Sequence, residues 1–133
     1  MSKVIGIIEA EVNLTEDPER VKIAIKNLFT PDSIELIAEE KRKMFIARFK
    51  GKEGLLTFYT ILRQERILNA ARRVLRKGIG SEGLTFCLNK QAAYVKRISF
   101  CEPIGESPLG PISVRIVSDE PGDLIDWLAP KMD

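Results

Sequence analysis

The stretch KVIGIIEAEVNLTEDPERVKIAIKNL (Lys3–Leu28) decides the fold class, because its hydrophobic pattern changes period halfway along. Residues 3–14 alternate and are rich in Val and Ile, which is typical of a β-strand. Asp17 then suits the N-cap of a helix, and Pro18 suits the first helical turn, where its missing N–H costs nothing. Apolar residues recur at helical spacing from there to Leu28. The stretch therefore predicts a strand followed by an amphipathic helix.

The rest of the chain predicts five more strands and two more helices. Strands are expected at residues 33–39, 44–51, 84–88, 94–101 and 112–117, and helices at 52–77 and 121–128. Polar residues at 63–66 interrupt the longer helix and indicate a bend or break. The order β-α-β-β-α-β-β-β-α predicts an α+β fold, with a mostly antiparallel sheet and helices packed on one face. A loop is expected at 107–111, which holds two prolines and a glycine.

Length and composition predict a single domain over residues 1–133. The chain has a mass of 15.0 kDa and 44% hydrophobic residues, which excludes a disordered chain. Glu9 and Glu11 break the first apolar run too early for a signal peptide. No stretch approaches the roughly 18 apolar residues that span a bilayer. We therefore expect a cytoplasmic protein without a membrane partner.

The inventory of reactive side chains argues against an enzyme. The chain contains no histidine, so Ser-His-Asp and Cys-His catalysis are excluded. Cys87 and Cys101 form no CxxC pair, and two thiolates without histidine fall short of a zinc site. We interpret both as buried thiols, with a disulfide as the alternative, and a hairpin here would place them opposite each other. We predict no catalytic residue, no metal and no cofactor.

The net charge of +2 hides a strong segregation along the chain. Residues 1–40 sum to −5, residues 41–101 to +12 and residues 102–133 to −5. A basic middle between acidic ends points to an anionic partner. The alternative is internal, because the acidic ends can fold against the basic middle and neutralise it.

Two basic clusters are candidates for phosphate contacts. The first lies on the face of the long helix opposite its apolar face, and consists of Arg63, Arg66, Arg72, Arg73, Arg76 and Lys77. The second lies at the tip of the hairpin expected between residues 33 and 51, and consists of Lys41, Arg42 and Lys43. Arginine's planar fork suits bidentate phosphate contacts. A solvated helix face and a soluble edge strand are the structural alternatives.

The aromatic residues favour a packed core over base stacking. Phe45, Phe49, Phe86 and Phe100 fall at strand spacing, on predicted inward positions. The stretch from Arg42 to Phe49 lacks the glycine and the aromatic spacing of an RNA-recognition motif. Phosphate contacts with little base recognition are therefore the predicted mode.

Three stretches stand out as a set: residues 3–27, Leu88–Ala93 and Glu106–Ile112. Together they resemble an uncharacterised archaeal protein family, numbered 0201 among families of unknown function. The resemblance implies a fold like that of the large-subunit ribosomal protein that binds 5S rRNA. It also implies a member of a group predicted to bind RNA, and it assigns no binding residues.

Two functions from different classes stay open. In the first, the protein is a small non-catalytic domain that binds RNA through the basic helix face and the hairpin tip, with low sequence specificity. In the second, it is a protein-interaction or self-associating module, such as a homodimer, in which acidic ends neutralise the basic middle.

Overall fold

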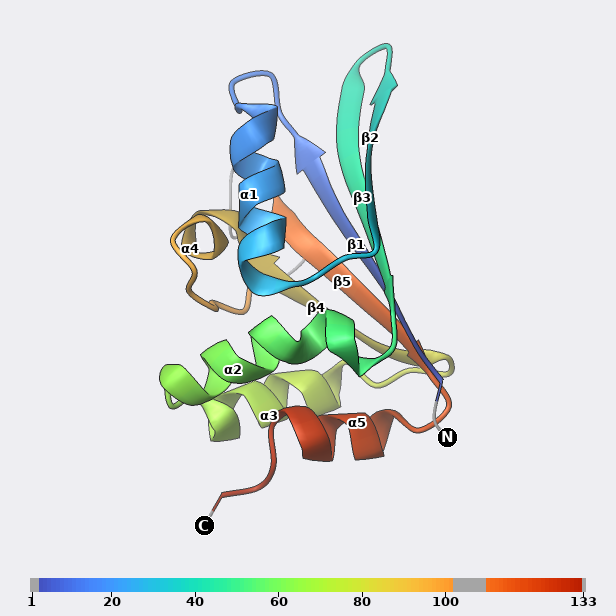
Figure 1. The fold of residues 1–133 in the computed structure, drawn as a ribbon, viewed down its shortest axis with the longest axis vertical. Helices are drawn as coiled ribbons and strands as arrows, with labels where there is room; N and C mark the ends of the chain where they lie inside the picture. The colour runs from blue at the N-terminus through green and yellow to red at the C-terminus, as the bar shows by residue number, and fades with distance from the viewer. Residues whose placement is uncertain (1–2, 102–109, 133) are drawn as a thin grey trace.

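The computed structural model describes residues 3–101 and 110–132, which form one antiparallel sheet and a set of helices (Figure 1). The sheet order is β2-β3-β1-β5-β4. The strands are β1 (Val4–Val12), β2 (Ser33–Glu39), β3 (Arg42–Lys50), β4 (Gly83–Asn89) and β5 (Pro111–Ser118). The helices are α1 (Pro18–Leu28), a 3₁₀ turn (Lys52–Leu55), α2 (Leu56–Gln64), α3 (Leu68–Lys77), α4 (Lys90–Tyr94) and α5 (Pro121–Leu128).

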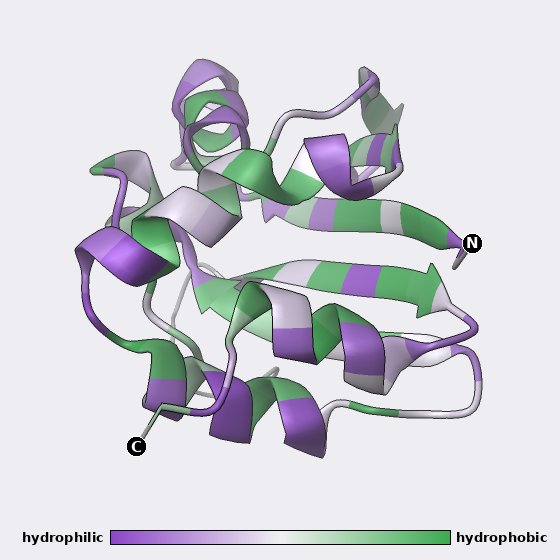
Figure 2. Cartoon of the chain, turned by 60° about the horizontal axis from the view of Figure 1, so that its bottom comes forward, coloured by the Kyte–Doolittle hydropathy of each residue, from purple (hydrophilic) through white to green (hydrophobic). Residues whose placement is uncertain are grey.

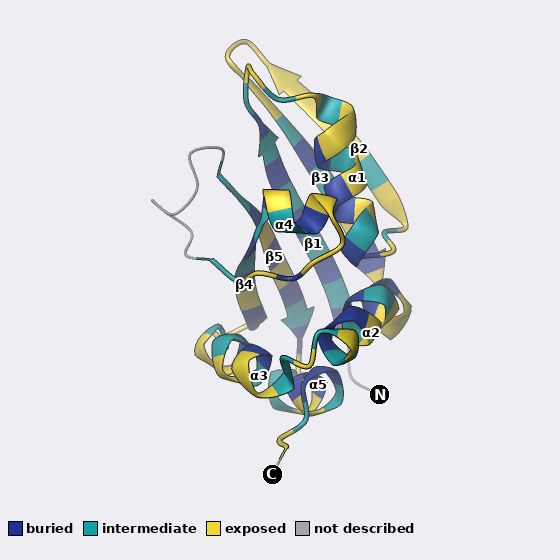
Figure 3. Ribbon diagram, turned by 90° about the vertical axis from the view of Figure 1, so that its left-hand side faces the viewer, coloured by how far each residue is buried: buried dark blue, intermediate teal, exposed yellow. Residues whose placement is uncertain are grey.

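The helices lie on one face of the sheet, which confirms the predicted α+β class (Figures 1 and 3). In β1, buried and half-buried residues alternate along the whole strand, so one face belongs to the core. Ile8 of β1 and Phe49 of β3 are buried on that face. We call the other side the open face; Ile7 and Glu9 of β1 lie there, half-buried. Bands of hydrophobic and hydrophilic residues alternate along α3 and α5, as expected for amphipathic helices (Figure 2).

The start of α1 follows the sequence prediction. The Asp17 side chain accepts a hydrogen bond from the backbone N–H of Glu19 at 3.0 Å, and Pro18 occupies the first turn. Val21 and Ile25 are buried, so the helix packs the face that its periodicity predicts.

The predicted break in the long helix is confirmed. It separates α2 from α3, and Arg66 there has a φ of 57°, in the left-handed region. The break turns the two segments into separate helices. The 100° periodicity counted from Arg66 therefore holds only within α3.

The strand predicted at residues 94–101 is wrong. The Asn89 side chain accepts a hydrogen bond from the N–H of Ala92 at 2.9 Å and starts α4, which ends at Tyr94, and residues 95–99 form a turn and an irregular segment. The strand was predicted because Tyr94, Val95, Ile98 and Phe100 have high β-propensity. Of the expected pairing, a bridge between Leu88 and Phe100 remains. The Cys101 N–H donates to the Cys87 carbonyl at 3.1 Å, so these two residues do lie opposite each other.

An aromatic cluster joins the helices to the sheet. The Phe58 ring of α2 stacks on Phe29 at 5.2 Å and on Phe86 of β4 at 5.5 Å between ring centroids. Phe58 has no solvent exposure. Of the aromatic side chains predicted for the core, Phe45, Phe49 and Phe86 are buried in it and Phe100 is half-buried against it.

Two further predictions concern a membrane span and a loop. Across residues 3–101 and 110–132, no helix combines the length and apolar character that crossing a membrane requires. The loop expected at 107–111 falls mostly outside the described residues.

Candidate nucleic-acid interface

The two predicted basic clusters lie at opposite ends of the long axis of the molecule. The tip of the β2–β3 hairpin projects at one end and α3 packs near the other (Figures 1 and 3). The structure therefore does not combine them into one surface.

The hairpin tip mixes basic and acidic side chains. Lys41 and Lys43 are exposed, but Arg42 pairs with Glu11, with 3.3 Å between Nε and Oε1. Glu39 of the same hairpin lines the adjoining hollow together with all three basic residues. The positive charge of the tip is therefore partly neutralised by the N-terminal acidic block.

The Arg63 side chain binds the C-terminal end of α5. Its guanidinium lies 3.5 Å from the Tyr59 ring centroid. It donates to the carbonyls of Leu128 at 3.1 Å and Trp127 at 3.2 Å. A cation at these terminal carbonyls is favoured by the helix dipole. Arg63 therefore fastens α2 to α5.

Arg72 also binds the end of α5. It pairs with Asp126 at 2.7 Å and donates to the Ala129 carbonyl at 3.2 Å, while its side chain is only 19% exposed. Asp126 belongs to the C-terminal acidic block. Part of the neutralisation considered from the sequence is therefore present, and it involves Arg72 rather than the whole helix face.

Four predicted residues remain exposed, and we call them the basic face: Arg66, Arg73, Arg76 and Lys77. The last three fall within an arc of about 100° on α3. Helix α3 contains no Asp or Glu. Within the described parts of the chain, none of the four has an ion-pair partner. The basic face thus concentrates positive charge, and Glu65 beside Arg66 is the nearest acidic residue to it in sequence.

The fold adds basic residues that sequence reasoning missed. The Ile98 N–H donates to the Glu65 carboxylate at 2.9 Å, which brings the segment after α4 beside the break. Exposed Lys96 and Arg97 precede Ile98 directly. Their adjacency was a signal, but the wrong strand prediction placed them in a sheet. They extend positive charge from Arg66 toward α4.

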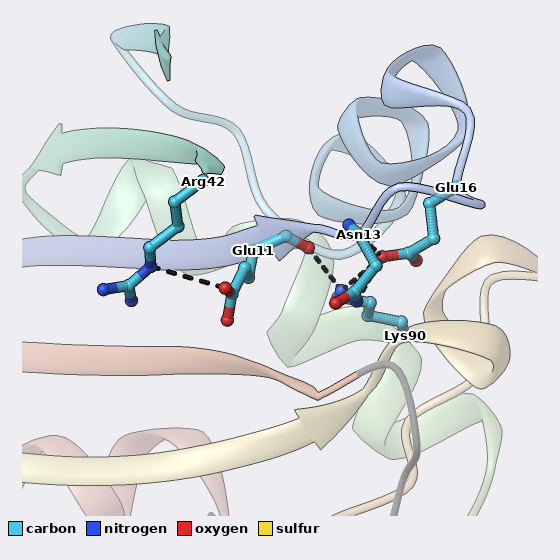
Figure 4. A network of polar contacts seen from close by, with 5 residues as sticks. All are labelled: Glu11, Asn13, Glu16, Arg42 and Lys90. Carbon is cyan, nitrogen blue, oxygen red and sulfur yellow. Dashed lines mark hydrogen bonds and ion pairs between the residues drawn. The ribbon is translucent and has the colours of Figure 1, made fainter. Parts of the chain in front are cut away.

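Lys90, although part of the basic middle, is buried. It is 5% exposed, and its Nζ lies 2.9 Å from Oε1 of Glu16, which is 11% exposed (Figure 4). Nζ also donates to the Glu11 carbonyl. Burial alone would raise the pKa of Glu16, but hydrogen bonds from Asn13 and the Lys90 ammonium outweigh burial and lower that pKa below 4.5. The pair links α4 to the loop that precedes α1.

The Glu16 carboxylate predicts a pH dependence of stability. A lowered folded pKa gives a stabilisation that is present above the ordinary value of 4.5 and is lost as the pH falls through the folded pKa. A Glu16→Gln variant should therefore be less stable than wild type at pH 7, and this difference should shrink as the pH falls toward about 3. Urea unfolding at each pH measures it. A difference that stays constant with pH would contradict the assignment.

Comparisons with known proteins match the chain to a family model and to several relatives of similar length. Residues 7–117 match the model of a protein family described as RNA binding. A UPF0201 protein of Sulfurisphaera tokodaii is 47% identical over 134 residues, covering 98% of this chain and 89% of the relative. One of Metallosphaera sedula is 42% identical over 125 residues, covering 94% of this chain and 87% of the relative.

Solved structures agree with the fold. The crystal structure of the UPF0201 protein from Methanococcus jannaschii superposes with a TM-score of 0.81 at 33% identity, covering 97% of this chain and 95% of the other. The expected likeness to the 5S-rRNA-binding ribosomal protein stays a prediction. The extent of these matches shows that the chain belongs to the uncharacterised archaeal UPF0201 family.

Proposed function

We propose that this protein is a small non-catalytic domain that binds RNA phosphates through the basic face. The observation that carries the proposal is the exposure of Arg73, Arg76 and Lys77 on α3, a helix without Asp or Glu, together with exposed Arg66 two residues before that helix. The match of residues 7–117 to a family described as RNA binding supports it.

Phosphate contacts suit this surface better than base recognition. Arginine side chains bind phosphate oxygens in a bidentate manner and carry no sequence information by doing so. The aromatic side chains of the described strands give no stacking platform on the sheet, since Phe45, Phe49 and Phe86 point into the core. Binding should therefore follow RNA shape and charge, with low sequence specificity.

The hairpin tip has a secondary role in this proposal. Lys41 and Lys43 are exposed, but Glu39 and Glu40 adjoin them in sequence and Arg42 is paired. The hairpin tip and α3 lie near opposite ends of the molecule, so one short RNA can bind one of these surfaces without contacting the other. The tip therefore offers a control for the basic face.

Changing Arg66, Arg73 and Arg76 together to Glu should abolish most RNA binding. We expect the affinity to fall by about 100-fold at 150 mM salt, because phosphate contacts are replaced by repulsion. The log–log salt slope for a structured RNA should decrease by roughly one for each phosphate that the variant no longer binds. Fluorescence anisotropy with a mixed structured-RNA pool measures both quantities. Arg72 is left unchanged because it pairs with Asp126.

The control changes Lys41 and Lys43 to Glu, which reverses two charges against three in the arginine variant. The affinity of this variant should fall by less than about tenfold if the basic face dominates. Wild-type binding no tighter than about millimolar would reject the proposal, since even non-specific binding is commonly about 0.1 mM or tighter. Equal reductions in the two variants would reject the assignment to α3.

A protein-interaction module is the second candidate. The pairs Arg42–Glu11 and Arg72–Asp126 favour it, because acidic ends do neutralise two of the predicted basic residues. It predicts that the arginine variants change the oligomeric state while RNA affinity stays the same.

A further inference from the structure

We propose that the open face of the sheet binds a second copy of this chain and forms a two-fold symmetric dimer. Among the described residues, no helix lies over the centre of this face (Figures 1 and 3). The end of α3 borders it, because Val74 and Lys77 line a hollow together with Ile7, Glu9 and Arg115. The centre of the face is apolar and only half-buried, and comprises Ile5, Ile7, Met44, Ile46 and Val117. A sheet with an apolar face is normally covered by a second layer, and a patch of this kind marks an interaction surface.

Charges on the open face divide into two adjacent levels along the strands. At the level of Ile7, Arg48 of β3 and Arg115 of β5 flank the central strand. At the next level, two residues along β1, the central residue is Glu9. The face therefore presents a basic level beside an acidic one.

Glu35 and Glu11 reinforce the acidic side. Glu35 of β2 lies at the level of Glu9, two strands away. Glu11 lies one level further along β1. Lys50, in contrast, lies one level beyond Arg48 on the basic side. Both carboxylates also form ion pairs within the chain, Glu11 with Arg42 at 3.3 Å and Glu35 with Arg48 at 3.9 Å. Among the described residues, Glu9 and Arg115 have no such partner, so they are the charges best placed to pair with a second copy.

This arrangement is self-complementary about one kind of two-fold axis. The axis lies parallel to the sheet, runs perpendicular to the strands and passes between the Ile7 and Glu9 levels. Rotation about this axis places the basic level of each copy against the acidic level of the other copy. Packed sheets are about 10 Å apart and strands about 4.8 Å apart. Arg48 and Arg115 can then reach Glu9 of the second copy from either side. An isologous contact requires such a pattern.

The size of the face is adequate for a weak or moderate dimer. Five strands at about 4.8 Å, over a strand length of about 24 Å, give on the order of 600 Å² of flat area per copy. Stable interfaces begin near roughly 1,200 Å² in total for both partners. The face also contains carboxylates and no aromatic side chain among the described residues, which disfavours RNA as its occupant.

The test uses two charge-reversal variants, Arg115→Glu and Glu9→Arg. In a homodimer, Arg115→Glu creates two like-charge contacts with Glu9, and Glu9→Arg creates four with Arg48 and Arg115, so each should weaken self-association at least about tenfold. An equimolar mixture should associate more tightly than either variant alone, because three of the four contacts between the two variants are then attractive. Sedimentation velocity from about 1 to about 300 μM measures association. Lys77 lines the same hollow as Arg115. We leave it unchanged because it also belongs to the basic face proposed to bind RNA.

Each outcome of the sedimentation experiment either supports or overturns the proposed dimer. Wild type at twice the 15.0 kDa chain mass, two weakened variants and recovery in the mixture would support the proposal. A wild-type monomer throughout the concentration range would overturn it. A dimer that both variants leave unchanged would also overturn it, since the contact would then use another surface, such as the exposed β2 edge.

Discussion

Replacing Lys90 by Met is expected to destabilise the fold by about 3–5 kcal/mol, the usual effect of removing one partner of a buried ion pair. The variant leaves the Glu16 carboxylate without its ammonium partner in a site where Glu16 is only 11% exposed. It also removes the donor to the Glu11 carbonyl. Urea unfolding at pH 7 should show a lower midpoint with an unchanged slope.

The double variant Lys90→Met, Glu16→Met separates charge from packing. Removing both charges is often close to neutral, because neither ion then remains buried without a partner. We expect the double variant to recover more than half of the stability that the single variant loses. A single variant destabilised by less than about 1 kcal/mol would show that the pair is not a buried one.

Replacing Phe58 by Ala should cost about 3–5 kcal/mol in the free energy of unfolding. Phe58 is completely buried and contacts the Phe29, Phe86 and Phe100 rings. The truncation therefore opens a cavity where α1, α2 and β4 meet. Thermal and urea unfolding measure the destabilisation.

Two control variants test whether the destabilisation comes from the lost packing of Phe58. Phe58→Leu keeps most of the volume and should be clearly more stable than the alanine variant. Leu14→Ala removes a fully exposed apolar side chain and should change stability by less than about 0.5 kcal/mol. Similar destabilisation by Phe58→Ala and Leu14→Ala would contradict the packing described for the cluster.

Several elements could be predicted because their causes are local. The Asp17-Pro18 start of α1, the hairpin between β2 and β3 and the break at Arg66 all follow from caps, turns and periodicity. The region after Asn89 could not be predicted in the same way. The side chain of Asn27 in α1 donates to the carbonyls of Ala93 at 3.1 Å and Tyr94 at 2.9 Å. That contact between distant segments stabilises α4 against the strand that propensity favours.

The candidate site was predicted only in part. The arginines of the long helix are equivalent in sequence, yet Arg63 and Arg72 bind the end of α5 while Arg73 and Arg76 remain exposed. Sequence spacing gives their angle around the helix but not the position of α5. The neighbouring Lys96 and Arg97 were missed because a wrong strand hid their position.

By itself, the amino-acid sequence determined the α+β class, the alternating core face and the separation of charge into three blocks. These depend on periodicity and composition, which are properties of neighbouring residues. Only the tertiary structure decided which charges stay exposed without a partner. Lys90 meets Glu16 across 74 residues of chain, and Arg72 meets Asp126 across 54. Electrostatic energy depends on distance and burial in space, so a net charge of +2 describes neither the buried pair nor the exposed basic face.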